Sequence, residues 1–270
     1  MRNRRDTMLL LGTAALAAVP AMAPAVAAEE GAWRDIRPWL FNERPIEDGS
    51  GLFTLEAPKR AHDAAIVPIG IKALQSLPPE RAIRSIHLII DDNPAPLAAV
   101  FRLGPALGSV DLSARVRVNT YTNVRAVAET ADGRLWMVER FVKASGGCSA
   151  PSMKDADEAQ ARIGKMKLKT LAASAPGASP VIELLVSHPQ YTGMQIDQLT
   201  RHWIPPDHVQ TIAIRFDGQP VLDIEADISL SEDPALGFTL ASAGHGTLAV
   251  TVDDIKDRHF EQSWQVGPGT

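Results

Sequence analysis

Short apolar runs punctuated by Gly, Pro, Asn and Asp make up most of the sequence, and few stretches sustain a helical period. The alternation is clearest over residues 110–118. Its apolar members would share one face and its polar members the other: Val110, Leu112, Ala114, Val116 and Val118 against Asp111, Ser113, Arg115 and Arg117. A period of two residues is typical of a strand with one buried face. The chain is therefore predicted to be all-β.

The strand pattern recurs in two halves. Strands are predicted near 52–56, 65–71, 83–90, 97–103, 110–118, 122–129 and 134–143 in the first half, and near 181–187, 209–216, 220–227, 237–241, 247–252 and 258–266 in the second. Asp132-Gly133 and Asp217-Gly218 lie between consecutive strands and predict hairpin turns, because Gly tolerates the positive φ that tight turns demand. Each half has the size and strand number of an immunoglobulin-like β-sandwich.

Three shorter segments complete the predicted organisation. Residues 31–41 are expected to form a short helix covering one end of a sheet, residues 153–163 a second helix, and residues 165–171 an edge strand. The run A-A-S-A-P-G-A-S-P at 172–180 has the composition of a linker. We therefore expect one sandwich domain over 29–150, a helix and linker over 151–179, and a second sandwich domain over 180–270.

The N-terminal residues 1–28 have the pattern of an export signal. Arg2, Arg4 and Arg5 precede an apolar stretch that is short for a membrane span, and small residues follow in an A-x-A pattern. The Arg4-Arg5 pair followed by Asp6 suggests the twin-arginine route. The expected location is periplasmic, with no membrane span after processing. Removing this leader changes the net charge from −5 to −7, and an acidic chain without a basic patch is not expected to bind nucleic acid.

Cys148 is the one cysteine in the sequence and lies in the run K-A-S-G-G-C-S-A-P at 143–151. A lone cysteine in an exported protein is either a free reactive thiol or half of an intermolecular disulfide. Gly146 and Gly147 predict a mobile, unhindered segment around it. The alternative is a thiol on a flexible loop without a function, which would be a redox liability in an oxidising compartment.

The surroundings of Cys148 in the sequence predict a lowered thiol pKa. A predicted helix start follows the cysteine, and the N-terminus of a helix carries partial positive charge. Lys143 and Lys154 lie nearby in the sequence. Positive charge favours the thiolate, which is the nucleophilic form.

No motif in the sequence indicates a metal, a cofactor or a catalytic group. The patterns G-x-S-x-G, G-x-G-x-x-G, H-E-x-x-H and C-x-x-C and the P-loop are absent. The histidines are predicted to be structural or solvated, because a metal site needs three or four converging ligands: they are His62, His87, His188, His202, His208, His245 and His259. His188 and Asp207 are expected to fix loops.

Other polar and aromatic residues are interpreted as structural. The pairs Asp91-Asp92 and Asp253-Asp254 would suit calcium or acid–base chemistry, but solvated turns are the preferred interpretation. Trp136 alternates within a strand and is predicted to lie in the core. Trp203 is predicted to pack at the interface between the domains.

Several stretches resemble one family. The stretches that resemble SoxY are D-D-N-P-A-P-L-A-A-V-F (91–101), A-R-V-R-V-N-T-Y-T-N-V-R-A-V-A-E-T-A-D-G-R-L-W (114–136) and G-G-C (146–148). Those similar to SoxZ are S-H-P-Q-Y-T-G (187–193), I-P-P-D-H-V-Q (204–210), D-G-Q-P-V (217–221) and S-E-D-P (231–234). The whole is similar to the fused SoxYZ-like carriers associated with quinoprotein dehydrogenases.

The resemblance implies two packed immunoglobulin-like sandwiches, a periplasmic location and a cysteine on a swinging arm. Cys148 would hold a sulfur compound such as thiosulfate covalently, with Gly146 and Gly147 as the flexible arm, and present it to sulfur-oxidising haem proteins. The chain would then be a carrier and not an enzyme. The chain departs from SoxY where it continues beyond the cysteine, so that the arm is tethered at both ends.

Two alternatives stay open. One is a non-covalent accessory protein of a periplasmic quinoprotein (PQQ) dehydrogenase or its cytochrome, in which Cys148 is dispensable. The other is a metal-dependent redox enzyme built on the sandwich.

Overall fold

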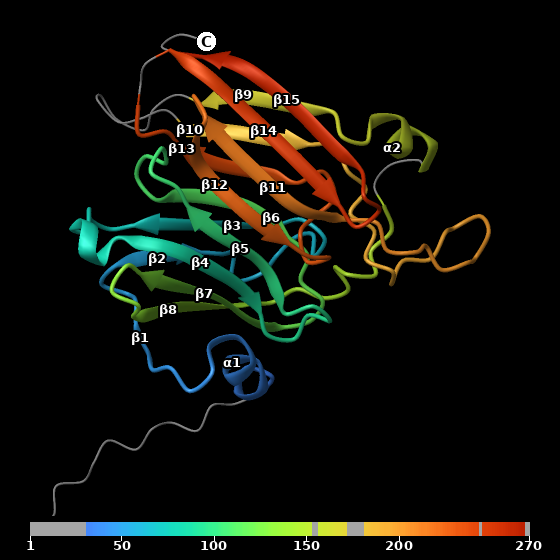
Figure 1. Cartoon of the computed structure of the whole chain (residues 1–270). Coiled ribbons are helices and arrows are strands. Elements are labelled where there is room, and N and C mark those ends of the chain that lie inside the picture. The colour runs from blue at the N-terminus through green and yellow to red at the C-terminus, as the bar shows by residue number, and fades with distance from the viewer. Residues whose placement is uncertain (1–30, 153–155, 172–180, 243–244, 268–270) are drawn as a thin grey trace, which may run out of the picture.

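Two β-sheets packed face to face form the body of the molecule (Figure 1). The computed structural model describes residues 31–152, 156–171, 181–242 and 245–267. The predicted leader at 1–28 and the predicted linker at 172–180 lie outside the described residues. None of the described helices is long and apolar enough to cross a membrane.

The helices and strands follow the order of the sequence prediction. In the first half they are α1 (Trp33–Phe41), β1 (Ile46–Asp48), β2 (Phe53–Glu56), β3 (Val67–Ala73), the 3₁₀ helix η1 (Pro79–Arg81), β4 (Ile83–Ile90), β5 (Leu97–Leu103), β6 (Asp111–Val116), β7 (Thr122–Thr130) and β8 (Leu135–Val142). They continue with α2 (Ala156–Arg162), β9 (Met166–Leu171), β10 (Val181–Val186), β11 (Val209–Phe216), β12 (Gln219–Ala226), β13 (Ala235–Thr239), β14 (Gly246–Asp254) and β15 (His259–Val266).

The all-β prediction is confirmed, since every predicted strand is present. The edge strand predicted at 165–171 is β9, which lies at the end of its sheet. The sequence prediction missed β1 and η1. β1 is only three residues long and pairs in parallel with β8, so it has no room for a recognisable alternation.

The two halves are joined edge to edge through both sheets. The larger sheet runs β1-β8-β7-β4-β5-β12-β11-β14-β15 and the smaller one β2-β3-β6-β13-β10-β9. β5 of the first half pairs antiparallel with β12 of the second, and β6 pairs with β13. Figure 1 shows these green and orange strands side by side. The two sandwiches thus share continuous sheets, so the junction between them is a fixed part of the structure.

One hydrophobic cluster fills the space between the sheets and spans both halves. Phe53, Ile86 and Val116 represent the first half in this cluster, and Ile212 and Phe238 the second, all at most 1% exposed. Burial of apolar area on this scale is the main driving force of folding. The shared core fixes the position of the loops at the junction, where Cys148 lies.

The predicted N-terminal helix is confirmed as α1, which covers the outer face of the larger sheet. Trp33 and Phe41 pack on Ile89, Val127 and Leu135 of β4, β7 and β8. This part of the sheet is therefore buried on both faces, which explains why its strands read as nearly continuous apolar runs.

Candidate functional site

The cysteine arm, residues 143–151, is docked between the two halves, and the Cys148 side chain is 0% exposed. The Gly146 N–H donates to Asn119 O at 2.8 Å, and the Gly147 N–H donates to Val118 O at 3.1 Å. The expectation of an unhindered thiol is therefore wrong for this structure. Backbone hydrogen bonds hold the glycines that precede the cysteine.

Gly147 is needed for close packing as well as for any flexibility. A Cβ at this position would lie 2.1 Å from Ala64 O and 2.7 Å from Val118 O, which is closer than atoms can approach. Gly146 has φ +80 and open space around it, so it supplies a turn that other residues rarely adopt. Together the two glycines let the backbone enter the junction.

A loop of the second half holds the arm on its other side. This clamp loop, residues 187–208, connects β10 to β11. Thr192 Oγ1 donates to Cys148 O at 2.6 Å, and Gln195 Nε2 donates to Ala150 O at 3.0 Å. Both halves of the chain therefore contribute to the docked position of the cysteine.

Arg117 lies next to the arm and is 1% exposed. Its Nη1 donates to Gly147 O at 3.1 Å, and its Nη2 donates to Gln190 O of the clamp loop at 3.4 Å. Burial lowers the pKa of Arg117, and the negative charges of Glu232 and Asp63 partly oppose this lowering. The alternation had predicted Arg117 on the polar face, but β6 ends at Val116, and Arg117 turns into the interior instead.

Burial controls the chemistry of the thiol. It raises the pKa of Cys148 to about 11, and the nearby positive charge of Arg117 only partly opposes this rise. The predicted lowering of the thiol pKa is therefore wrong. The reason is that desolvation outweighs nearby charge, and that α2 begins only at Ala156. A docked Cys148 is a neutral thiol at neutral pH and a poor nucleophile.

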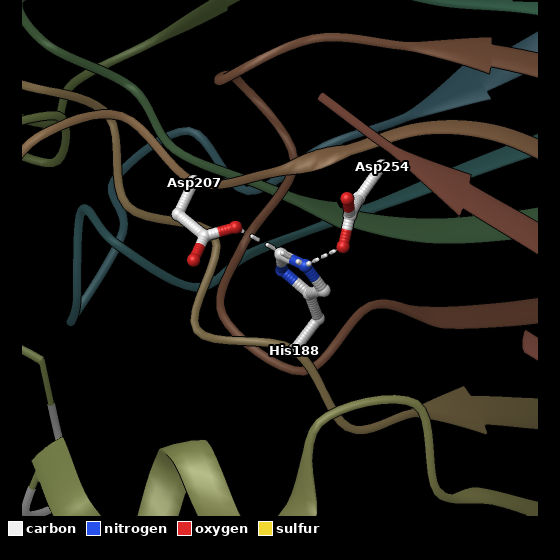
Figure 2. Close-up of side chains that lie close together, drawn as sticks. All are labelled: His188, Asp207 and Asp254. Atoms are coloured by element: carbon white, nitrogen blue, oxygen red, sulfur yellow. Dashed lines mark hydrogen bonds and ion pairs between the residues drawn. The ribbon is translucent and has the colours of Figure 1, made fainter. Parts of the chain in front are cut away.

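A second buried polar cluster lies at the base of the clamp loop: His188, Asp207 and Asp254 (Figure 2). His188 Nε2 lies 3.3 Å from Asp254 Oδ2 and 3.7 Å from Asp207 Oδ1. Arg258 Nε donates to Asp254 Oδ2 at 2.6 Å, and Arg258 Nη2 donates to Asp207. Lys256 Nζ lies 2.8 Å from the other oxygen of Asp207. Two carboxylates are thus matched by two cations.

The side chains of this cluster do not suit a metal ion as ligands. The Gln190 N–H donates to His188 Nδ1 at 3.2 Å, so the neutral imidazole carries its proton on Nε2, which faces the carboxylates. Burial lowers the pKa of His188 even though both carboxylates favour its charged form. The available lone pair is used by the loop backbone. The prediction that His188 and Asp207 fix loops agrees with these contacts.

Comparison with known families decides what this architecture is. The family model described as "Sulfur oxidation protein SoxY" matches residues 38–148, and the one described as "Sulphur oxidation protein SoxZ" matches residues 168–265. The chain is a fused SoxYZ-like protein. The resemblance stated from the sequence is thereby confirmed, and the SoxY match ends at Cys148 itself.

Several solved structures are similar to this chain, and one of them is a SoxY protein. The sulfur carrier protein SoxY from Chlorobium limicola f thiosulfatophilum is 25% identical, over 42% of this chain and 94% of that chain, with a TM-score of 0.35. No curated protein matches the chain. The family descriptions place the fused SoxYZ-like protein in sulfur oxidation.

Several predicted residues lie outside the site of the SoxYZ-like protein. Trp203 is 65% exposed, so the prediction that it packs at the domain interface is wrong. Trp136 is partly buried against the core. Asp91 is buried and ion-paired with Arg125 at 2.9 Å. The interpretation as solvated turns therefore fails for Asp91 and for Asp254.

Sequence reasoning missed the residues that hold the arm. The regular alternation over residues 110–118 predicted that Arg117 lies on the polar face, and so concealed its burial. Thr192 lies inside the SoxZ-like stretch 187–193, but nothing local marks it as a contact of Cys148. Gln195 carries no signal at all. Such contacts join residues far apart in the chain, and they become visible only once the halves are placed together.

Proposed function

We propose that the chain is a periplasmic carrier that holds a sulfur compound covalently on Cys148 and presents it to partner enzymes. One observation carries the proposal: the one cysteine of the chain stands at the end of the SoxY match, directly after two glycines. Residues 1–28 would direct export. A thiol suits this task, because sulfur forms S–S bonds reversibly.

Thiosulfate illustrates the loading step. The Cys148 sulfur bonds to the outer sulfur of thiosulfate to give Cys148–S–SO₃⁻. The thiol proton is released, and two electrons leave for an oxidant, a haem protein in this proposal. Near Cys148 the described residues supply hydrogen-bond donors and one cation, none of which accepts electrons. The redox step therefore belongs to the partner.

The docked arm is the protected state of the carrier in this proposal. Docking keeps Cys148 as a neutral thiol and shields it from stray oxidation. Undocking requires the loss of the hydrogen bonds from Thr192 and Gln195, and it returns the thiol pKa to its ordinary value of 9.0. The partner would then meet a reactive thiol only when the arm is presented.

The intact mass of the protein, purified from its native periplasm without reductant, tests the proposal. We expect an adduct that reductant removes, with a mass in steps of sulfur or sulfur oxide, and no adduct on Cys148→Ser. A thiol that is unmodified, and that stays inert when offered sulfide or thiosulfate with an oxidant, would contradict the proposal.

A second candidate function is favoured by an exposed apolar surface on the clamp loop. Leu199 is 92% exposed and Trp203 is 65% exposed, which suits a protein partner. The chain would then be a non-covalent accessory protein of a quinoprotein (PQQ) dehydrogenase or its cytochrome. Cys148→Ser separates the two candidates. The accessory role predicts that this variant keeps its function in vivo, whereas Leu199→Asp with Trp203→Asp loses it.

A further inference from the structure

Arg117 is a buried cation that, among the described residues, donates its hydrogen bonds to carbonyls and to no carboxylate. Its guanidinium donates to two backbone carbonyls, those of Gly147 and Gln190, at 3.1 and 3.4 Å. Glu232 and Asp63 act on it through their charges, but the side-chain hydrogen bonds of Arg117 in the part of the chain that the structure describes go to backbone carbonyls. Burying a charged group without an opposite charge is unfavourable.

Two buried N–H donors at this point also lack acceptors. Arg117 Nε and Gln190 Nε2 have no hydrogen-bond partner among the described residues. The Gln190 amide already uses its oxygen to accept from the Val209 N–H at 2.6 Å, so its nitrogen is left over. Buried donors in native structures nearly always have partners. One donor comes from each half of the chain, and both lie where the halves meet the arm.

These donors suit an anion on the cysteine. Arg117 contacts Gly147, which precedes Cys148, and Gln190 belongs to the clamp loop that holds the Cys148 carbonyl. A sulfonate group on the cysteine, as in Cys148–S–SO₃⁻, brings one negative charge and three acceptor oxygens. Charge-assisted hydrogen bonds from a guanidinium to such oxygens are among the strong ones.

We propose that Arg117, with the amide of Gln190, is the counter-charge that selects anionic over neutral groups on Cys148. The inference rests on the carrier function proposed above and adds its cargo class. Arg117 is thus a specificity-determining residue. A neutral cargo would leave the buried cation and the two donors unmatched, so its arm would undock more readily.

The test compares two adducts made chemically on the full-length protein. The Cys148 thiolate attacks a central sulfur of tetrathionate, which gives Cys148–S–SO₃⁻ and releases thiosulfate. With methyl methanethiosulfonate it gives Cys148–S–CH₃ and releases methanesulfinate. Loading is followed to completion by intact mass. Release by dithiothreitol is then timed for each adduct in the wild type and in Arg117→Met, so that intrinsic differences between the adducts cancel in the ratio.

Arg117→Met is expected to speed release of the sulfonate about tenfold, the factor that one charge-assisted hydrogen bond provides. Release of the methyl adduct should change by less than about twofold. Arg115→Met is the matched control, since Arg115 lies two residues earlier with a side chain that is 44% exposed, and it should alter neither rate. Arg117→Lys should keep part of the slower release of the sulfonate adduct, because lysine keeps the positive charge.

Two results would overturn the inference: equal acceleration of both adducts, which makes Arg117 a simple clamp, or no acceleration of either. If Arg117→Met does not fold, the wild type still decides, because the sulfonate adduct must unfold at a higher temperature than the methyl adduct. The carrier proposal fails separately, by the absence of any native adduct, since the adducts compared here are made in vitro.

Discussion

Arg258, whose side chain is 24% exposed, and the buried Arg117 are two arginines of the same junction with opposite surroundings. Arg258 donates to the carboxylates of Asp254 and Asp207, and Lys256 completes the balance of charge. Arg117 donates to two carbonyls and lies near a neutral thiol, and Glu232 and Asp63 act on it through their charges alone. A matched network fixes structure, whereas an unmatched cation leaves room for an incoming negative charge. Within the same junction, Arg258 therefore has a structural role, whereas Arg117 is a candidate for binding an anion.

The two sites are linked by the clamp loop. His188 and Asp207 at its base belong to the matched network, and Thr192 and Gln195 in its middle hold the arm. The Gln190 N–H donates to His188, while the Gln190 carbonyl accepts from Arg117. The matched cluster therefore sets the position from which the arm is held.

The largest expected effect is on stability, from breaking the matched network. Burial alone would raise the pKa of Asp254, but hydrogen bonds from Arg258 and from two backbone amides outweigh it and leave the pKa below its ordinary value. Asp254→Ala removes one charge from a buried network, which costs about 3 kcal/mol. Urea unfolding measures it. Asp253→Ala, at the partly exposed neighbour, should cost well under half as much, and equal losses would contradict a special role for the network.

The next effect concerns the reactivity of Cys148. With a pKa of about 11 against an ordinary value of 9.0, the docked thiol should be alkylated about a hundredfold more slowly at pH 8 than in the urea-unfolded chain, since only thiolate reacts. Iodoacetamide labelling followed by intact mass measures both rates. A native rate within about threefold of the unfolded one would show that the arm is undocked in solution.

The same pKa difference makes stability depend on pH. A thiol whose pKa is raised by folding stabilises the protein fully below its unfolded pKa, and this contribution is lost as pH rises from 9.0 toward about 11. At pH 10 the loss should be about 1.4 kcal/mol. Urea unfolding of the wild type and of Cys148→Ser at pH 8 and pH 10 isolates it, because serine does not titrate there. Parallel losses in the two proteins would contradict burial of the thiol.

The fold could be predicted from the sequence far better than the site. Alternating runs and the Asp-Gly turns fixed the strands, because both signals are local. The pairing of β5 with β12 and of β6 with β13 could not be predicted, since register across the halves depends on side chains that are distant in sequence. The prediction of the protonation and exposure of Cys148 was wrong for the same reason. Glycines and lysines beside it indicated an exposed thiolate, but the burial that dominates its pKa arises where both halves of the chain hold the arm.

A smaller effect is expected from loosening the clamp. Thr192→Val keeps the shape of the side chain and removes the donor to Cys148 O, a hydrogen bond worth about 1 kcal/mol. Undocking should become about fivefold more frequent, and alkylation of Cys148 should speed up by the same factor. Thr54→Val on β2 removes a weak hydroxyl contact far from the arm and serves as the control. An unchanged labelling rate would mean that the Thr192 contact does not hold the arm.

The smallest effect is the stability change in Arg117→Met, and it directly tests the difference between Arg117 and Arg258. The variant loses two hydrogen bonds to carbonyls, worth about 1 kcal/mol each, but it also removes the penalty of burying an unmatched charge. The two terms oppose each other, so the free energy of unfolding of the unloaded protein, measured in urea, should change by less than about 1 kcal/mol. A loss as large as that of Asp254→Ala would show that Glu232 and Asp63 already match Arg117 at longer range, and the two arginines would then not differ.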